Sequence, residues 1–150
     1  MNSKQTIEVN DDVLKGLLKA SHYFEGVLVS TTDQSLAENT SRYLAVDTLG
    51  IISIEHGAAL RFLISDARCY TSSYALFRLQ YEALVKAMWA FYIASDEQLE
   101  LIVGDLSTER AVENGKKLPP ISKMLKQLED ANTPAHHTIL QLIQFKDISW

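Results

Sequence analysis

Four ionisable side chains and one tryptophan lie on two neighbouring apolar segments, and their types and spacing could support chemistry. Glu55 and His56 belong to the first segment, whereas Arg78, Glu82 and Trp89 belong to the second. An ionisable group in an apolar helix is costly to bury unless another group pairs with it. These residues therefore predict either a structural polar network or the lining of a small pocket.

A histidine side chain changes its charge near neutral pH, so His56 could act as a general base or hold a ligand. The alternative is a core histidine that is hydrogen-bonded to a carbonyl group or to a carboxylate on another helix. Glu55 directly precedes His56, and on a helix consecutive side chains diverge by about 100°. Glu82 on the next segment is therefore the better candidate partner for His56.

Arg78 and Glu82 are separated by four positions, a spacing that lets two side chains pair along one helix. A functional role for Arg78 would be to bind a phosphate or a carboxylate. A structural role would be an ion pair that fixes how two helices pack, and for that role we predict that Glu82→Ala destabilises the fold.

Other residues on these segments give weaker signals for a site. The aromatic side chains could line a ligand pocket, fill the core or form a homodimer interface. No E-x-x-H motif and no cysteine–histidine spacing typical of zinc occurs, so we predict neither a metal site nor a cofactor. Cys69, next to Arg68, is interpreted as a small residue in a helix connector rather than as a nucleophile. The aromatic residues are Tyr74, Tyr81, Trp89, Phe91 and Tyr92.

The spacing of apolar residues predicts an all-α fold. Ile51–Ile64 and Ser73–Ala94 are expected to form its central antiparallel hairpin. Ahead of them, a helix that begins after Asn10 carries one apolar stripe at three- and four-residue spacing. We expect residues 1–150 to form a single-domain, mostly up-and-down bundle of about five or six helices. The stripe consists of Val13, Leu14, Leu17, Leu18, Ser21, Phe24 and Leu28.

Capping and turn residues predict where the helices begin and end. Gly50 and Gly57 are expected to let a neighbouring helix approach closely, and Ser95 with Gln98 forms a capping box. A second box is predicted at Thr31 and Gln34. The remaining boundaries are a start capped by Ser72 or Ser73, an end at Asn114-Gly115, a start at Pro120 and a start at Thr133-Pro134.

Charge and composition limit the classes of partner. The net charge of −5 does not favour nucleic acid, which binds to a basic face. A single cysteine and an N-terminus without a signal-peptide pattern predict a cytoplasmic protein. The longest apolar segment contains Arg78, Glu82 and Lys86, so it is expected to be a core helix and not a membrane span. The apolar end at 148–150 fits a docked natural C-terminus or a cut within a longer protein equally well.

Three segments resemble a family of bacterial helical proteins of unknown function. They are S-I-E-H-G-A-A-L-R-F-L-I (Ser53–Ile64), Y-A-L-F-R-L-Q-Y-E-A-L-V-K-A-M-W (Tyr74–Trp89) and A-S-D-E-Q-L (Ala94–Leu99). The family pattern is a histidine-bearing helix followed by R-x-x-x-E-A and a tryptophan on the next helix. The matching positions are His56, Arg78, Glu82, Ala83 and Trp89.

More distantly, the chain is similar to the HEPN superfamily of helical domains, which includes ribonucleases of toxin–antitoxin and phage-defence systems. This resemblance implies an active site of the form R-x(4–6)-H on a late helix. No histidine in the chain follows an arginine at that spacing, since Arg61, Arg68, Arg78 and Arg110 all lack one.

The function expected from the sequence is a cytoplasmic protein-interaction module that self-associates as a homo-oligomer. Its polar residues would be structural or would line a pocket. The alternatives are a HEPN-like ribonuclease or defence component whose catalytic motif is absent from this chain, and a small-ligand sensor. An apolar cavity beside Trp89 would indicate the sensor.

Overall fold

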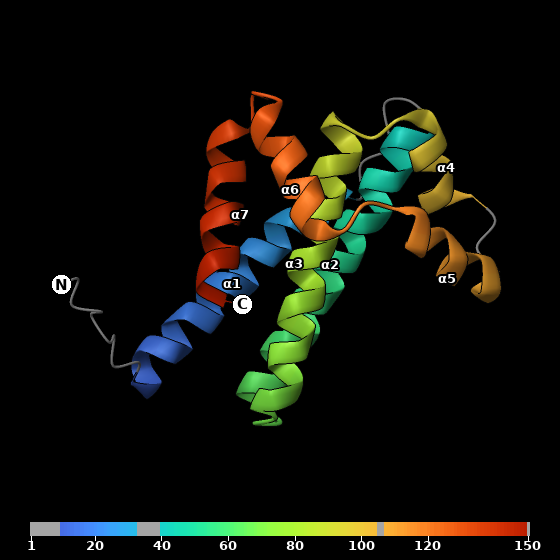
Figure 1. The fold of residues 1–150 in the computed structure, drawn as a ribbon. Helices are drawn as coiled ribbons and strands as arrows, with labels where there is room; N and C mark the ends of the chain where they lie inside the picture. The colour runs from blue at the N-terminus through green and yellow to red at the C-terminus, as the bar shows by residue number, and fades with distance from the viewer. Residues whose placement is uncertain (1–9, 33–39, 105–106, 150) are drawn as a thin grey trace.

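The computed structural model describes residues 10–32, 40–104 and 107–149. These residues form no strand, and their seven helices confirm the expected all-α fold. The count is slightly higher than the expected five or six, and it includes the weakly patterned segment after Ser107 as α5. The helices are α1 (Asp11–Thr32), α2 (Ser41–Ser65), α3 (Tyr70–Tyr92), α4 (Asp96–Val103), α5 (Thr108–Lys117), α6 (Ile121–Asp130) and α7 (His136–Ser149) (Figure 1).

The two longest helices, α2 and α3, lie side by side and antiparallel and form the centre of the fold (Figure 1). This hairpin confirms the expected one, although α2 begins earlier than Ile51 and α3 both begins and ends earlier than the predicted Ser73–Ala94. Thr40 caps α2, since its hydroxyl oxygen accepts from the Tyr43 N–H at 3.4 Å. Helix α3 begins at Tyr70, so the predicted cap at Ser72 or Ser73 is wrong. The Ser73 hydroxyl is already inside the first turn, where it donates to the Tyr70 carbonyl at 2.7 Å.

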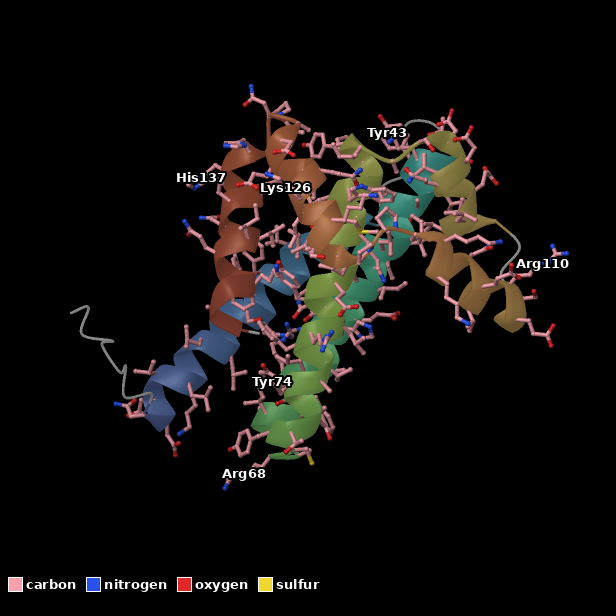
Figure 2. The ribbon with its side chains drawn as sticks, in the orientation of Figure 1. Tyr43, Arg68, Tyr74, Arg110, Lys126 and His137 are labelled. Carbon is pink, nitrogen blue, oxygen red and sulfur yellow. The ribbon has the colours of Figure 1, made fainter. Side chains whose placement is uncertain are left out.

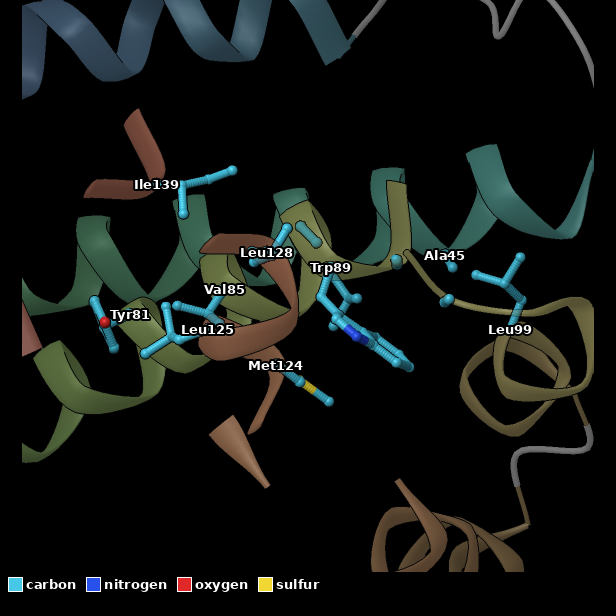
Figure 3. Packing of buried hydrophobic residues seen from close by; sticks show 13 residues of the cluster. Ala45, Tyr81, Val85, Trp89, Leu99, Met124, Leu125, Leu128 and Ile139 are labelled. Carbon is cyan, nitrogen blue, oxygen red and sulfur yellow. The ribbon is translucent and has the colours of Figure 1, made fainter. Parts of the chain in front are cut away.

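The core lies where the second half of α3 meets α6, α4 and α7. Trp89 is fully buried there, and its indole N–H donates to Oε1 of Gln127 on α6 at 2.8 Å. Tyr81 links α3 to α7, since its hydroxyl donates to the Leu142 carbonyl at 2.7 Å. Both bonds satisfy the polar end of a buried aromatic side chain. Figure 3 shows Trp89 among Val85, Leu99, Met124, Leu128 and Ile139.

Arg42 ties the beginning of α2 to the end of α3. Its guanidinium donates to the carbonyls of Ala90, Phe91 and Ala94, at 2.6, 3.2 and 2.8 Å. The last carbonyls of a helix have no partner within the helix and carry the negative end of its dipole. Arg42 supplies both hydrogen bonds and positive charge at this point. It also lies 3.8 Å from the carboxylate of Asp96, the first residue of α4.

Local capping chemistry explains most of the helix ends. The Asn10 side chain accepts from the Val13 N–H at 2.9 Å, which confirms the predicted start of α1. The capping box of Ser95 and Gln98 is also confirmed. The predicted box at Thr31 and Gln34 requires Gln34, which lies outside the described residues.

Three later boundaries differ from the prediction. Helix α5 continues through Gly115, where an end was predicted, and an ion pair of 3.0 Å between Glu113 and Lys117 spans the glycine. Pro120 is the residue before α6 rather than its first residue. Helix α7 begins at His136, after a turn in which Asn132 has a φ of 44°.

Candidate functional site

The five predicted site residues do not form one network. Arg78 and Glu82 pair along α3, with Nε and Oε1 3.0 Å apart, and their side chains are 60% and 25% exposed. Glu55 is exposed on α2, and His56 is half-buried. Within the described residues, His56 and Glu82 are not hydrogen-bonded to each other. Trp89 belongs to the core, so of the predicted set only Arg78 and Glu82 are brought together.

The aromatic residues that were considered as a pocket divide between the core and the surface. Tyr81 and Trp89 are buried, whereas Tyr74 and Phe91 are exposed. Phe91 packs edge-on against Tyr92 with 4.7 Å between the ring centroids. Figure 2 shows Tyr74 on α3 near the end of the hairpin that carries the α2–α3 connector. The two cavities described below are lined by other residues than Trp89.

A polar cluster that the sequence did not indicate joins α1 to α2. The Arg61 guanidinium pairs with the Glu25 carboxylate and donates to the Ser21 hydroxyl at 3.1 Å. The side chains of Arg61 and Glu25 are only 13% and 21% exposed. Burial lowers the pKa of the Arg61 guanidinium below its ordinary value. Ser21 and Glu25 are four positions apart on one face of α1, which was the only signal for this cluster in the sequence.

A cavity of about 360 Å³ lies under α1 beside this ion pair. Gly57 forms part of its wall, and a Cβ atom at this position would lie 2.6 Å from Nε2 of Gln80 on α3. The close approach predicted at the two glycines of α2 is therefore confirmed at Gly57, by the Gln80 side chain, and is wrong at Gly50, where nothing lies within 4 Å of the position of a Cβ atom. The lining is mixed, with the polar residues Ser21, Glu25, Ser53, Arg61 and Gln80 opposite Ala20, Phe24, Leu28 and Ile54.

A second, mostly apolar groove of about 490 Å³ lies between α1 and the connector end of the hairpin. Together the two cavities show that α1 packs loosely on the hairpin. The groove is lined by Leu14, Leu17, Leu18, Ser21, Leu60, Arg61, Ile64, Tyr70, Ser73, Tyr74 and Phe77.

Helix α1 carries a large exposed apolar surface. Leu17 and Phe24 are 60% and 64% exposed, and no residue of α1 whose side chain is described is buried. The single stripe predicted from the sequence is therefore two adjacent faces. Leu14 and Leu18 turn toward α2 and are half-buried, whereas the neighbouring stripe is exposed, and its Leu17, Ala20 and Phe24 also border the two cavities. We define the outer stripe as Val13, Leu17, Ala20, Phe24 and Val27.

Metal binding and membrane insertion find no support in the described parts of the chain. No group of three or more histidine, cysteine, aspartate or glutamate side chains lies close enough together there to hold a metal ion. No helix in those same ranges has both the length and the apolar character needed to cross a bilayer.

The fold and the surface define an all-helical protein that exposes large apolar side chains along α1. Residues 50–150 match the model of a family of unknown function, DUF6988, and the chain belongs to that family. This match covers α3 to α7 and most of α2, including all of the predicted site residues. No curated protein and no solved structure matches the chain.

Proposed function

We propose that this protein is a cytoplasmic interaction module that self-associates, and that the outer stripe of α1 is its contact surface. The observation that carries the proposal is the exposure of large apolar side chains along one helix. A contiguous apolar patch on a soluble protein marks an interaction site, because leaving it in water forgoes the free energy of its burial. Phe24 is the natural anchor, since aromatic side chains are enriched at interfaces.

The polar residues have a supporting role in this proposal. Arg61 and Glu25 hold α1 on the hairpin, and the ion pair neutralises charges that lie mostly out of water. The Arg78–Glu82 pair stiffens α3 along its exposed side. We assign neither pair a catalytic role.

The test is the mass of the protein in solution. We expect sedimentation velocity to give a dimer for the wild type and a monomer for Leu17→Glu/Phe24→Glu, because a carboxylate in an apolar interface is costly. The control is Lys19→Glu, which changes the net charge equally but lies about 120° from the centre of the stripe. We expect this control to stay dimeric, and circular dichroism verifies that each variant is folded.

A wild type that sediments as a monomer at all concentrations would refute the proposal. If the Leu17→Glu/Phe24→Glu variant has the same mass in solution as the wild type, the interface lies on another surface of the protein. RNA that co-purifies with the protein would favour the nuclease class implied by the HEPN resemblance.

A further inference from the structure

We propose that the outer stripe binds the same stripe of a second copy, with the two α1 helices antiparallel. This inference rests on the proposed function and specifies its partner, orientation and register. It follows from the spacing, the sizes and the charges of residues on α1.

The outer stripe has the spacing of a coiled-coil seam. Its residues alternate steps of four and three positions, which is the pattern of apolar a and d positions in a heptad. They occupy about 80° of the helix circumference. Since α1 has 22 residues, the seam extends along a helix of about 33 Å. A narrow stripe of this kind fits one partner helix laid along it, beside the hairpin and over the cavities that Leu17, Ala20 and Phe24 border.

The sizes of the side chains favour the antiparallel orientation. In that orientation a positions meet d positions, and full overlap of the two helices places the two-fold axis near residue 22. Ala20 then lies opposite the partner's Phe24, and Leu17 lies opposite the partner's Val27. Each large side chain meets a smaller one, as tight packing requires. A parallel pair would instead place two Phe24 rings in one layer and two small Ala20 side chains in another.

The charges on α1 favour the same arrangement. The positions that flank the seam are uncharged, so nothing repels a second copy along its length. Asp11 and Asp12 begin the helix. A parallel pair would bring both acidic ends together, whereas the antiparallel pair separates them by about 33 Å, well beyond the screening length at physiological salt. The flanking residues are Leu14, Gly16, Ser21, Tyr23, Leu28 and Ser30.

Cysteine cross-linking tests the orientation. In a Cys69→Ser background, Leu17→Cys and Val27→Cys are prepared separately, oxidised alone and oxidised as an equimolar mixture. An antiparallel pair places position 17 of one copy opposite position 27 of the other, so only the mixture forms a disulfide-linked dimer. The two introduced thiols at position 17 would be about 15 Å apart along the axis, too far for a disulfide. Sedimentation of the reduced proteins verifies that each variant still associates.

Each outcome decides between this inference and the proposed function. A cross-linked dimer from the mixture alone supports the antiparallel pair. Cross-linking of each variant with itself would show a parallel pair and overturn the inference while leaving self-association intact. A dimer by sedimentation without any cross-link would place the interface away from α1. A wild type that is monomeric by sedimentation would refute the proposed function itself.

Discussion

The two sides of the α2–α3 hairpin bury apolar residues to very different extents. On the α6 side, Trp89 and Leu128 are fully buried in a continuous core (Figure 3). On the α1 side, cavities of about 360 and 490 Å³ remain, and Leu17 and Phe24 are mostly exposed. Both sides carry many apolar residues, so composition does not explain the difference. One side is closed by α4, α6 and α7, whereas the other leaves apolar side chains in water, and there we propose that a second copy binds.

The largest expected effect comes from a matched pair of leucine truncations. Leu128→Ala opens a cavity in the core, and we expect it to lower the free energy of unfolding by about 2–5 kcal/mol. Leu17→Ala removes an exposed side chain and should change it by about 0.5 kcal/mol at most. Urea denaturation at low protein concentration measures both values without a contribution from association. Equal losses would mean that α1 is as tightly packed as the core.

Next in size is the truncation of Arg42, which binds the end of α3. We expect Arg42→Ala to cost about 1.5–3 kcal/mol, because it leaves carbonyls at a helix end without their charged donor. Arg42→Lys should recover only the interaction with the helix dipole, about 0.3–1 kcal/mol, since an ammonium group cannot span three carbonyls. Urea denaturation again gives the comparison. A full recovery with lysine would show that charge alone matters at this position.

The sequence predicted the features that depend on neighbouring residues. The cap at Asn10, the box at Ser95 and Gln98 and the central hairpin all follow from local chemistry. A glycine permits a close approach but does not determine where one occurs, since Gln80 lies against Gly57 whereas no neighbour lies against Gly50.

The side-chain partners between helices could not be predicted. Arg61 pairs with Glu25, which is 36 positions earlier in the sequence. This contact depends on how far along α2 the helix α1 packs. The contact of Arg42 with the end of α3 likewise depends on the relative register of two long helices. Helix periodicity defines a face but not its register against a neighbour. The candidate network failed to assemble for the same reason, since Glu82 pairs within its own helix.

The smallest expected effects distinguish two ion pairs, Glu25–Arg61 between α1 and α2 and Arg78–Glu82 within α3. Glu25→Ala leaves the mostly buried Arg61 guanidinium without its carboxylate, and we expect it to cost about 1–2 kcal/mol. Glu82→Ala breaks a more exposed pair within one helix, so its cost should be about 0.5 kcal/mol or less. Both variants gain alanine in a helix, so intrinsic helix propensity affects them alike.

Hydrogen exchange shows which helices lose stability in the Glu25→Ala variant. We expect Glu25→Ala to speed exchange of the α1 amides roughly 5–30-fold while leaving the α3 amides near Trp89 unchanged, because only the docking of α1 is weakened. Glu82→Ala should leave α1 exchange as it is in the wild type. Equal acceleration throughout the chain would mean that α1 and the core unfold as one unit, and the contrast between the two sides of the hairpin would then be one of packing but not of stability.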